Sequence, residues 1–127
     1  MPRIIECVPN ISEGRDRAKI DAIVAAASGV EGVRVLDVDP GKATNRTVIT
    51  FVGEPEPVCE AAFQLVKKAQ ELIDMRTHTG EHPRFGATDV CPLVPISGIT
   101  LDELVPYAQK LGERIGRELA IPVYLYE

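Results

Sequence analysis

The strongest signal for the fold lies in residues 33–52, VRVLDVDPGKATNRTVITFV. Residues 33–38 are rich in β-branched side chains, and residues 46–52 alternate polar and apolar side chains, which is typical of a half-buried strand. The sequence Asp39-Pro40-Gly41 between them is a strong turn signal. Two strands joined by a short turn form a hairpin, so we expect two antiparallel neighbours in one sheet.

The segments on either side of this hairpin predict alternating strands and helices. Pro55 suits the first turn of a helix, and Thr100 with Glu103 fits a capping box at the start of another. Two prolines in the strand over 89–96 place it at a sheet edge or make it irregular. The other predicted elements are a strand over 3–8, a helix carrying Ile20 to Ala27 that stops at Gly29, a helix from Pro55 that fades near 74–76, a polar segment over 77–86, a helix ending near Leu119 and a strand over 123–126.

The resulting order is β-α-β-β-α-β-α-β, and its first six elements match the ferredoxin-like, split βαβ arrangement. We therefore predict an α+β fold, a ferredoxin-like βαββαβ sandwich with an added αβ unit. Its sheet should be mixed but mostly antiparallel, with helices covering one face. A chain of 127 residues suits one domain, so residues 1–127 are expected to form a single unit.

Composition narrows the class of protein. Hydrophobic residues make up 45% of the chain and charged residues 26%, which is an ordinary globular balance. The net charge of -5 disfavours a nucleic-acid partner, because such binders usually present a basic face. No apolar run approaches the roughly 20 residues that cross a bilayer. The three cysteines are widely spaced and no secretory leader is evident, so we expect a cytoplasmic protein that binds no membrane.

The segment over 77–86 holds the only two histidines, His78 and His82, together with Glu81 and Arg84. Loops held by a rigid scaffold often carry catalytic residues, and histidine titrates near neutrality, which suits proton transfer. An exposed polar loop whose histidines bond its own backbone explains these residues equally well.

A metal site is not expected in this segment. His78 and His82 are four residues apart, which suits a pair of ligands on a helix. Gly80 and Pro83 disfavour a regular helix there, and Thr79 stands where the helical zinc-protease pattern requires glutamate. No cysteines with close pair spacing complete a ligand set.

Two other polar clusters follow predicted strands. Asp39 could orient an imidazole, and Arg46 could hold a carboxylate with two hydrogen bonds. A solvated hairpin turn, in which Asp39 caps its own backbone, explains this cluster more simply. Asn10 and Ser12 lie just beyond the first predicted strand, where ligand-binding groups often project, but they equally suit the start of the next helix.

Taken together, several stretches resemble the glutamate formimidoyltransferase (formiminotransferase) family, and specifically its amino-terminal subdomain. Each stretch alone is weak, but they occur in the family's order along the whole chain. The matching pieces are Glu6 to Arg15, Leu36 to Gly41, Thr44 to Thr47, Phe51 to Pro55, Gly80 to Arg84, Gly86 to Pro92 and Pro122 to Glu127.

The resemblance implies transfer of a formimino group from N-formimino-L-glutamate to tetrahydrofolate, in histidine degradation and one-carbon metabolism. Some relatives use formiminoglycine, and the sequence does not decide between the two donors. The family's catalytic histidine maps onto His82, and Asp39 is the expected catalytic partner that sets its tautomer. The residues expected to bind substrate or folate are Asn10, Asn45, Arg46, Glu81 and Arg84.

The resemblance covers only the first of the family's two ferredoxin-like subdomains, between which folate and substrate bind. The favoured hypothesis is therefore a half-enzyme that needs a second transferase subdomain or self-association. Two alternatives stay open: a non-catalytic folate- or amino-acid-binding module of the same fold, and a structural or regulatory subunit.

Overall fold

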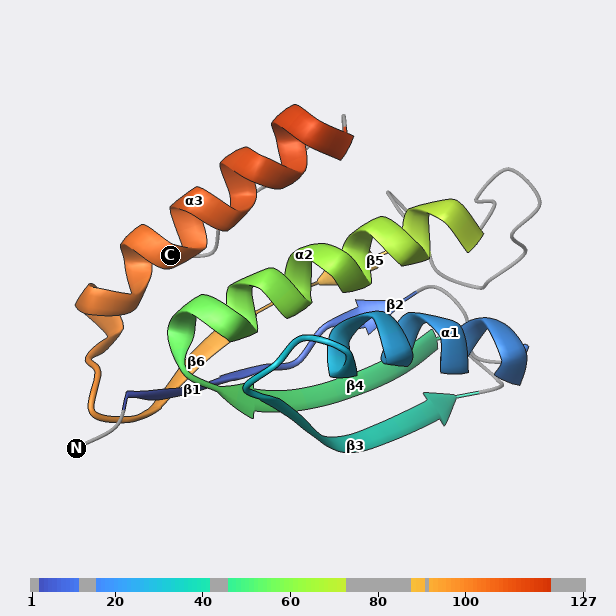
Figure 1. The fold of residues 1–127 in the computed structure, drawn as a ribbon, viewed down its shortest axis with the longest axis horizontal. Coiled ribbons are helices and arrows are strands. Elements are labelled where there is room, and N and C mark those ends of the chain that lie inside the picture. Colours follow the sequence, from blue (N-terminus) through green and yellow to red (C-terminus); the bar gives the residue numbers. More distant parts are fainter. Residues whose placement is uncertain (1–2, 12–15, 42–45, 73–87, 91, 120–127) are drawn as a thin grey trace.

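The computed structural model describes residues 3–11, 16–41, 46–72, 88–90 and 92–119. Within them, strands and helices alternate much as the sequence predicts (Figure 1). The elements are β1 (Ile4–Cys7), β2 (Asn10–Ile11), α1 (Arg17–Ser28), β3 (Val33–Gly41), β4 (Arg46–Gly53), α2 (Pro55–Leu72), β5 (Thr88–Val90), β6 (Leu93–Ser97) and α3 (Leu101–Leu119).

The strands form one six-stranded sheet in which each described pair is antiparallel. One edge of β4 pairs with β3, and the other pairs with β1 and then with β2, so β1 and β2 act as one interrupted strand. In the same way β5 pairs with β2, and β6 pairs with β1. Counting each interrupted strand once, the order is fourth, first, third, second, which is the ferredoxin-like order and confirms the predicted α+β fold.

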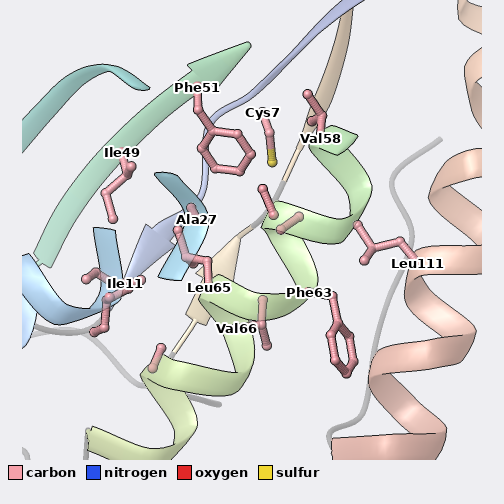
Figure 2. Packing of buried hydrophobic residues seen from close by; sticks show 14 of the residues in the cluster. Cys7, Ile11, Ala27, Ile49, Phe51, Val58, Phe63, Leu65, Val66 and Leu111 are labelled. Atoms are coloured by element: carbon pink, nitrogen blue, oxygen red, sulfur yellow. The ribbon is translucent and has the colours of Figure 1, made fainter. Parts of the chain in front are cut away.

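All three described helices lie on the same side of this sheet (Figure 1). α2 packs between α1 and α3, and the core forms where α1 and α2 meet the sheet. Figure 2 shows the Phe51 ring of β4 between that strand and α2, beside Cys7 of β1. We call the opposite side of the sheet, on which none of the described helices packs, the open face.

The alternation in β4 is the clearest link between the sequence and this layered structure. Thr47, Ile49, Phe51 and Gly53 are buried, whereas the residues between them are half-buried. Successive side chains of a strand point to opposite faces, so the first set faces the helices and the second faces away. The prediction of a half-buried strand over 46–52 is therefore confirmed.

Helix capping also follows the sequence. The Thr100 hydroxyl accepts a hydrogen bond from the Glu103 backbone N–H at 3.2 Å, and the Glu103 carboxylate accepts one from the Thr100 N–H at 2.9 Å. This is the predicted capping box, and it satisfies two donors at the start of α3. At the start of α1 the Asp16 carboxylate accepts from the Lys19 N–H, and Gly29 is the C-cap that the sequence predicts.

The hairpin differs from its prediction in one respect that matters for the site. β3 continues through Asp39, Pro40 and Gly41, where the sequence predicted a turn. Asp39 pairs with Val48 and Pro40 pairs with Thr47, so these residues extend the ladder. Proline is tolerated there because β3 pairs only with β4 among the described strands, and an edge strand can spare a backbone donor.

The first predicted strand is also longer than expected. Beyond β1, the chain re-enters the sheet as β2, whereas the sequence predicted that the first strand ends at Val8. The Ile49 N–H donates to the Pro9 carbonyl at 3.0 Å, which carries the pairing with β4 across the interruption. The predicted strand over 89–96 is irregular as expected, since it is divided into β5 and β6.

α2 is buried on more than one side because it packs between two helices. Phe63 is buried and faces α3, with the Arg114 guanidinium 3.7 Å from its ring centre. Arg114 also donates to Glu60 at 2.8 Å and to Glu118 at 3.1 Å.

No helix in the described part of the chain is long and apolar enough to cross a membrane.

Candidate active site on the open face

The open face brings together two candidate residues that are distant in sequence. Asn10 of β2 pairs with Val48 of β4, and Val48 pairs in turn with Asp39 of β3. Paired residues of antiparallel strands project from the same face. Ile11, the neighbour of Asn10, is fully buried on the helix side, so Asn10, Val48 and Asp39 form a row across the open face.

A β-bulge places Asp39 on this face. Val33 and Val35 pair with the helix-facing residues of β4, and the register then shifts between Val35 and Asp37. The extra residue, Leu36, reverses the alternation, so that Val38 turns toward the core and Asp39 turns away from it. Such re-aiming of side chains is a common role of bulges near functional sites.

Arg46 begins β4 on the same face, two residues before Val48. It is half-buried, and its Nε is shielded from solvent. Arg46 pairs with Gly41 and is a diagonal neighbour of Asp39, a relationship that places the two Cα atoms about 7–8 Å apart. A guanidinium and a carboxylate thus stand side by side at this end of the sheet.

The side chains of Asn10 and Asp39 have unused hydrogen-bonding capacity. Asn10 Nδ2 donates to the Val8 carbonyl at 3.4 Å, a long bond, and no hydrogen bond to the amide oxygen is seen from the residues that the structure describes. Within the described part of the chain, the structure shows no hydrogen bond or ion pair to the Asp39 carboxylate, and this residue is exposed. An acceptor, an amide and a guanidinium on one surface can bind a polar substrate and orient an imidazole.

The remaining candidates, Asn45, Glu81, His82 and Arg84, lie outside the described residues. The described strands that flank their segments reach the same end of the open face. β3 ends at Gly41 and β4 begins at its pairing partner Arg46, two residues from Asp39 and Val48 respectively. Likewise β5 begins at Thr88, which pairs with Ile11 next to Asn10.

Comparison with known proteins identifies the family of this chain. The family described as "Formiminotransferase domain, N-terminal subdomain" matches residues 4–127. The chain belongs to the formiminotransferase family.

Curated relatives agree with this assignment. The chain is 54% identical over 127 residues to a glutamate formimidoyltransferase of Streptococcus pyogenes serotype M1, covering 100% of this chain and 42% of the relative. It is 54% identical over 126 residues to a formimidoyltransferase-cyclodeaminase of Sus scrofa, covering 99% and 23%. A glutamate formimidoyltransferase of Thermoplasma acidophilum is 50% identical over 123 residues, covering 97% and 41%. The chain thus spans less than half the length of these relatives.

Four further polar residues of this formiminotransferase subdomain lie on the open face and were not among the sequence-predicted site residues. They are Glu6 of β1, Arg34 and Asp37 of β3, and Thr50 of β4. The strand period could have found Glu6, because the apolar Ile5 and Cys7 on either side of it face the core. Asp37 could not be found in this way, because the bulge at Leu36 breaks the period.

The described residues include no group of three or more His, Cys, Asp or Glu side chains placed to hold a metal ion. The open face offers carboxylate, amide, hydroxyl and guanidinium groups, separated by half-buried valines.

Proposed function

We propose that this chain is the amino-terminal subdomain, residues 1–127, of a glutamate formimidoyltransferase. Together with a second subdomain it transfers the formimino group of N-formimino-L-glutamate to tetrahydrofolate, in histidine degradation. The observation that carries the proposal is that Asn10, Asp39 and Arg46, which come from three strands and lie in the stretches that resemble the family, stand on one face. Membership of the family and the names of the relatives support the reaction.

In the proposed reaction, N5 of tetrahydrofolate attacks the amidine carbon of the donor and a tetrahedral adduct forms. One group must accept the proton from N5, and one must protonate the departing glutamate nitrogen. His82 performs both steps in turn, because a group that titrates near neutrality can exchange protons in both directions. Asp39 sets the tautomer of the imidazole, and Arg46 or Arg84 holds the carboxylates of the donor.

The open face is the proposed wall of the substrate site, and the second subdomain supplies the opposite wall. None of the described helices packs on this face, and half-buried valines alternate there with polar groups. The chain covers only 42% of the Streptococcus pyogenes relative, so that protein has room for a further subdomain of similar size. A single wall positions two substrates poorly, and positioning is a large part of bimolecular catalysis.

The test compares this chain alone with a chimera in which residues 1–127 replace the matching segment of the Streptococcus pyogenes relative. Formimino transfer to tetrahydrofolate is measured in both. Activity of the chimera, with little from the chain alone, is the expected result. A folded but inactive chimera, beside an active unmodified relative, would contradict the proposal and favour a non-catalytic binding module.

A second variant tests the proposed acid–base residue. His82→Ala in the chimera is expected to lower turnover by roughly 100- to 10,000-fold, the usual contribution of general acid–base catalysis. His78→Ala, the matched change at the other histidine of the chain, should leave turnover within a few-fold of the parent. Equal losses for both variants would show that His82 has no special role.

A further inference from the structure

Glu6 has an unusual position at the centre of the open face. It lies on β1, which is paired on both sides, with β4 at one edge and β6 at the other. Its direct partners are Val52 of β4 and Val94 of β6, so its carboxylate rises between two valines. Val94 is 39% exposed and Val52 is half-buried. The result is an apolar strip with one acidic group in its middle.

Within the described residues this acidic group has no protein partner. The structure shows no ion pair or side-chain hydrogen bond to Glu6, although Arg34 lies in the same row beyond Val52. A half-buried carboxylate gives up part of its hydration and is stabilised when N–H donors replace that water. Its position therefore favours a ligand that brings paired N–H donors together with a flat apolar surface.

We infer that Glu6 binds the pyrimidine edge of the tetrahydrofolate pterin, with its carboxylate accepting from N3–H and from the 2-amino group. This inference rests on the proposed function. A pterin presents these two donors side by side, which matches the two oxygens of a carboxylate, as a guanidinium does. The faces of the ring are apolar enough to lie along Val52 and Val94.

The amidine of the formimino donor also presents paired N–H groups, but its place is at the other end of the face. Glu6 precedes Asn10 by four residues of the interrupted strand, a separation of about 13 Å in extended backbone. The amidine carbon has to meet N5 beside Asp39, in the row of Asn10. N5 belongs to the second ring of the pterin, away from the pyrimidine edge, so a pterin anchored at Glu6 directs N5 toward that row.

The test measures binding to the chimera described above and to its Glu6→Gln variant. The ligands are tetrahydrofolate, a tetrahydrofolate analogue that lacks the 2-amino group, and formiminoglutamate. Glu6→Gln is expected to weaken tetrahydrofolate binding by roughly 10- to 100-fold, the value of a charge-assisted hydrogen bond pair. The analogue should bind the parent and the variant about equally, because the two changes remove the same contact. Affinity for formiminoglutamate should not change.

Glu113→Gln, an exposed change on α3, is the matched control, and thermal melting checks that both variants fold. Unchanged tetrahydrofolate affinity in a folded Glu6→Gln variant overturns the inference, while formimino transfer by the parent leaves the proposed function intact. A loss confined to formiminoglutamate would assign Glu6 to the amidine instead and also overturns it. A parent that binds no tetrahydrofolate would refute the proposed function, and the inference with it.

Discussion

The two faces of the sheet are formed by the same strands but differ in burial and in side-chain chemistry. On the helix side, β4 contributes Ile49 and Phe51, which are fully buried among aliphatic residues. On the open face, the same strand contributes Arg46, Val48, Thr50 and Val52, all of them half-buried. The first set determines that the chain folds, and the second holds the groups with hydrogen-bonding capacity. Substitutions on the two faces should therefore have separable effects.

The largest expected effect is on the helix side. Phe51→Ala removes a fully buried ring beneath α2 and should lower the free energy of unfolding by about 3–5 kcal/mol. Val52→Ala, the adjacent position on the open face, should cost about 1 kcal/mol or less, within the span of strand propensities. Chemical denaturation of both variants measures the difference. Similar losses at the two positions would show that the open face is packed as tightly as the core.

The next effect belongs to the open face and appears in activity. Asp39→Asn in the chimera should lower turnover by roughly 10- to 100-fold, because an amide cannot replace a charge-assisted hydrogen bond to an imidazole. The free energy of unfolding should change by no more than about 0.5 kcal/mol, because Asp39 is exposed and has no partner within the described residues. Asp21→Asn on α1 is the control for a surface carboxylate. Full activity of Asp39→Asn would remove Asp39 from the proposed mechanism.

The smallest effect is at the outer seam of the helix layer, where α2 and α3 meet through polar contacts. Hydrogen bonds from Gln64 and then from Arg114 lower the pKa of Glu60 below its ordinary value of 4.5. A carboxyl whose pKa is lower in the folded state stabilises the fold above the unfolded-state pKa, and this contribution disappears as the pH falls through the folded-state value. The wild type should therefore lose more stability on acidification than Glu60→Gln does.

This difference should stay below about 1 kcal/mol, because the Glu60 side chain is 41% exposed and solvent screens the pair. Thermal melting of both proteins between neutral pH and pH values below 4.5 measures it. Parallel melting curves across this range would show that the Arg114–Glu60 contact does not stabilise the fold.

Much of the helix side could be predicted from the sequence, because its signals are local. The capping box at Thr100 and the alternation in β4 depend on residues that are near one another in the chain, and both are confirmed. The burial of Phe63 could not be predicted in this way, because it depends on α3, which lies far along the sequence. Patterns within one helix cannot show that it will be covered on a second side.

The open face was harder to predict for a related reason. The sequence placed Asp39 in a turn, whereas the bulge at Leu36 and the tolerance of an edge strand for Pro40 keep it in β3. Its candidacy came from the polar cluster in which it lies and from the family resemblance, and not from the strand period. The role of His82 stays a prediction, since that residue lies outside the described part of the chain.

The extra residue in β3 has a consequence for comparing or redesigning members of this family. Between Val35 and Asp39, the number of residues matters more than their identity, because one deletion would exchange the inward and outward sets of the rest of the strand. An alignment that places a gap there would thus align a core valine of one member with a candidate catalytic aspartate of another. A loop-grafting or shortening design should leave the length of this segment untouched and make its changes outside it.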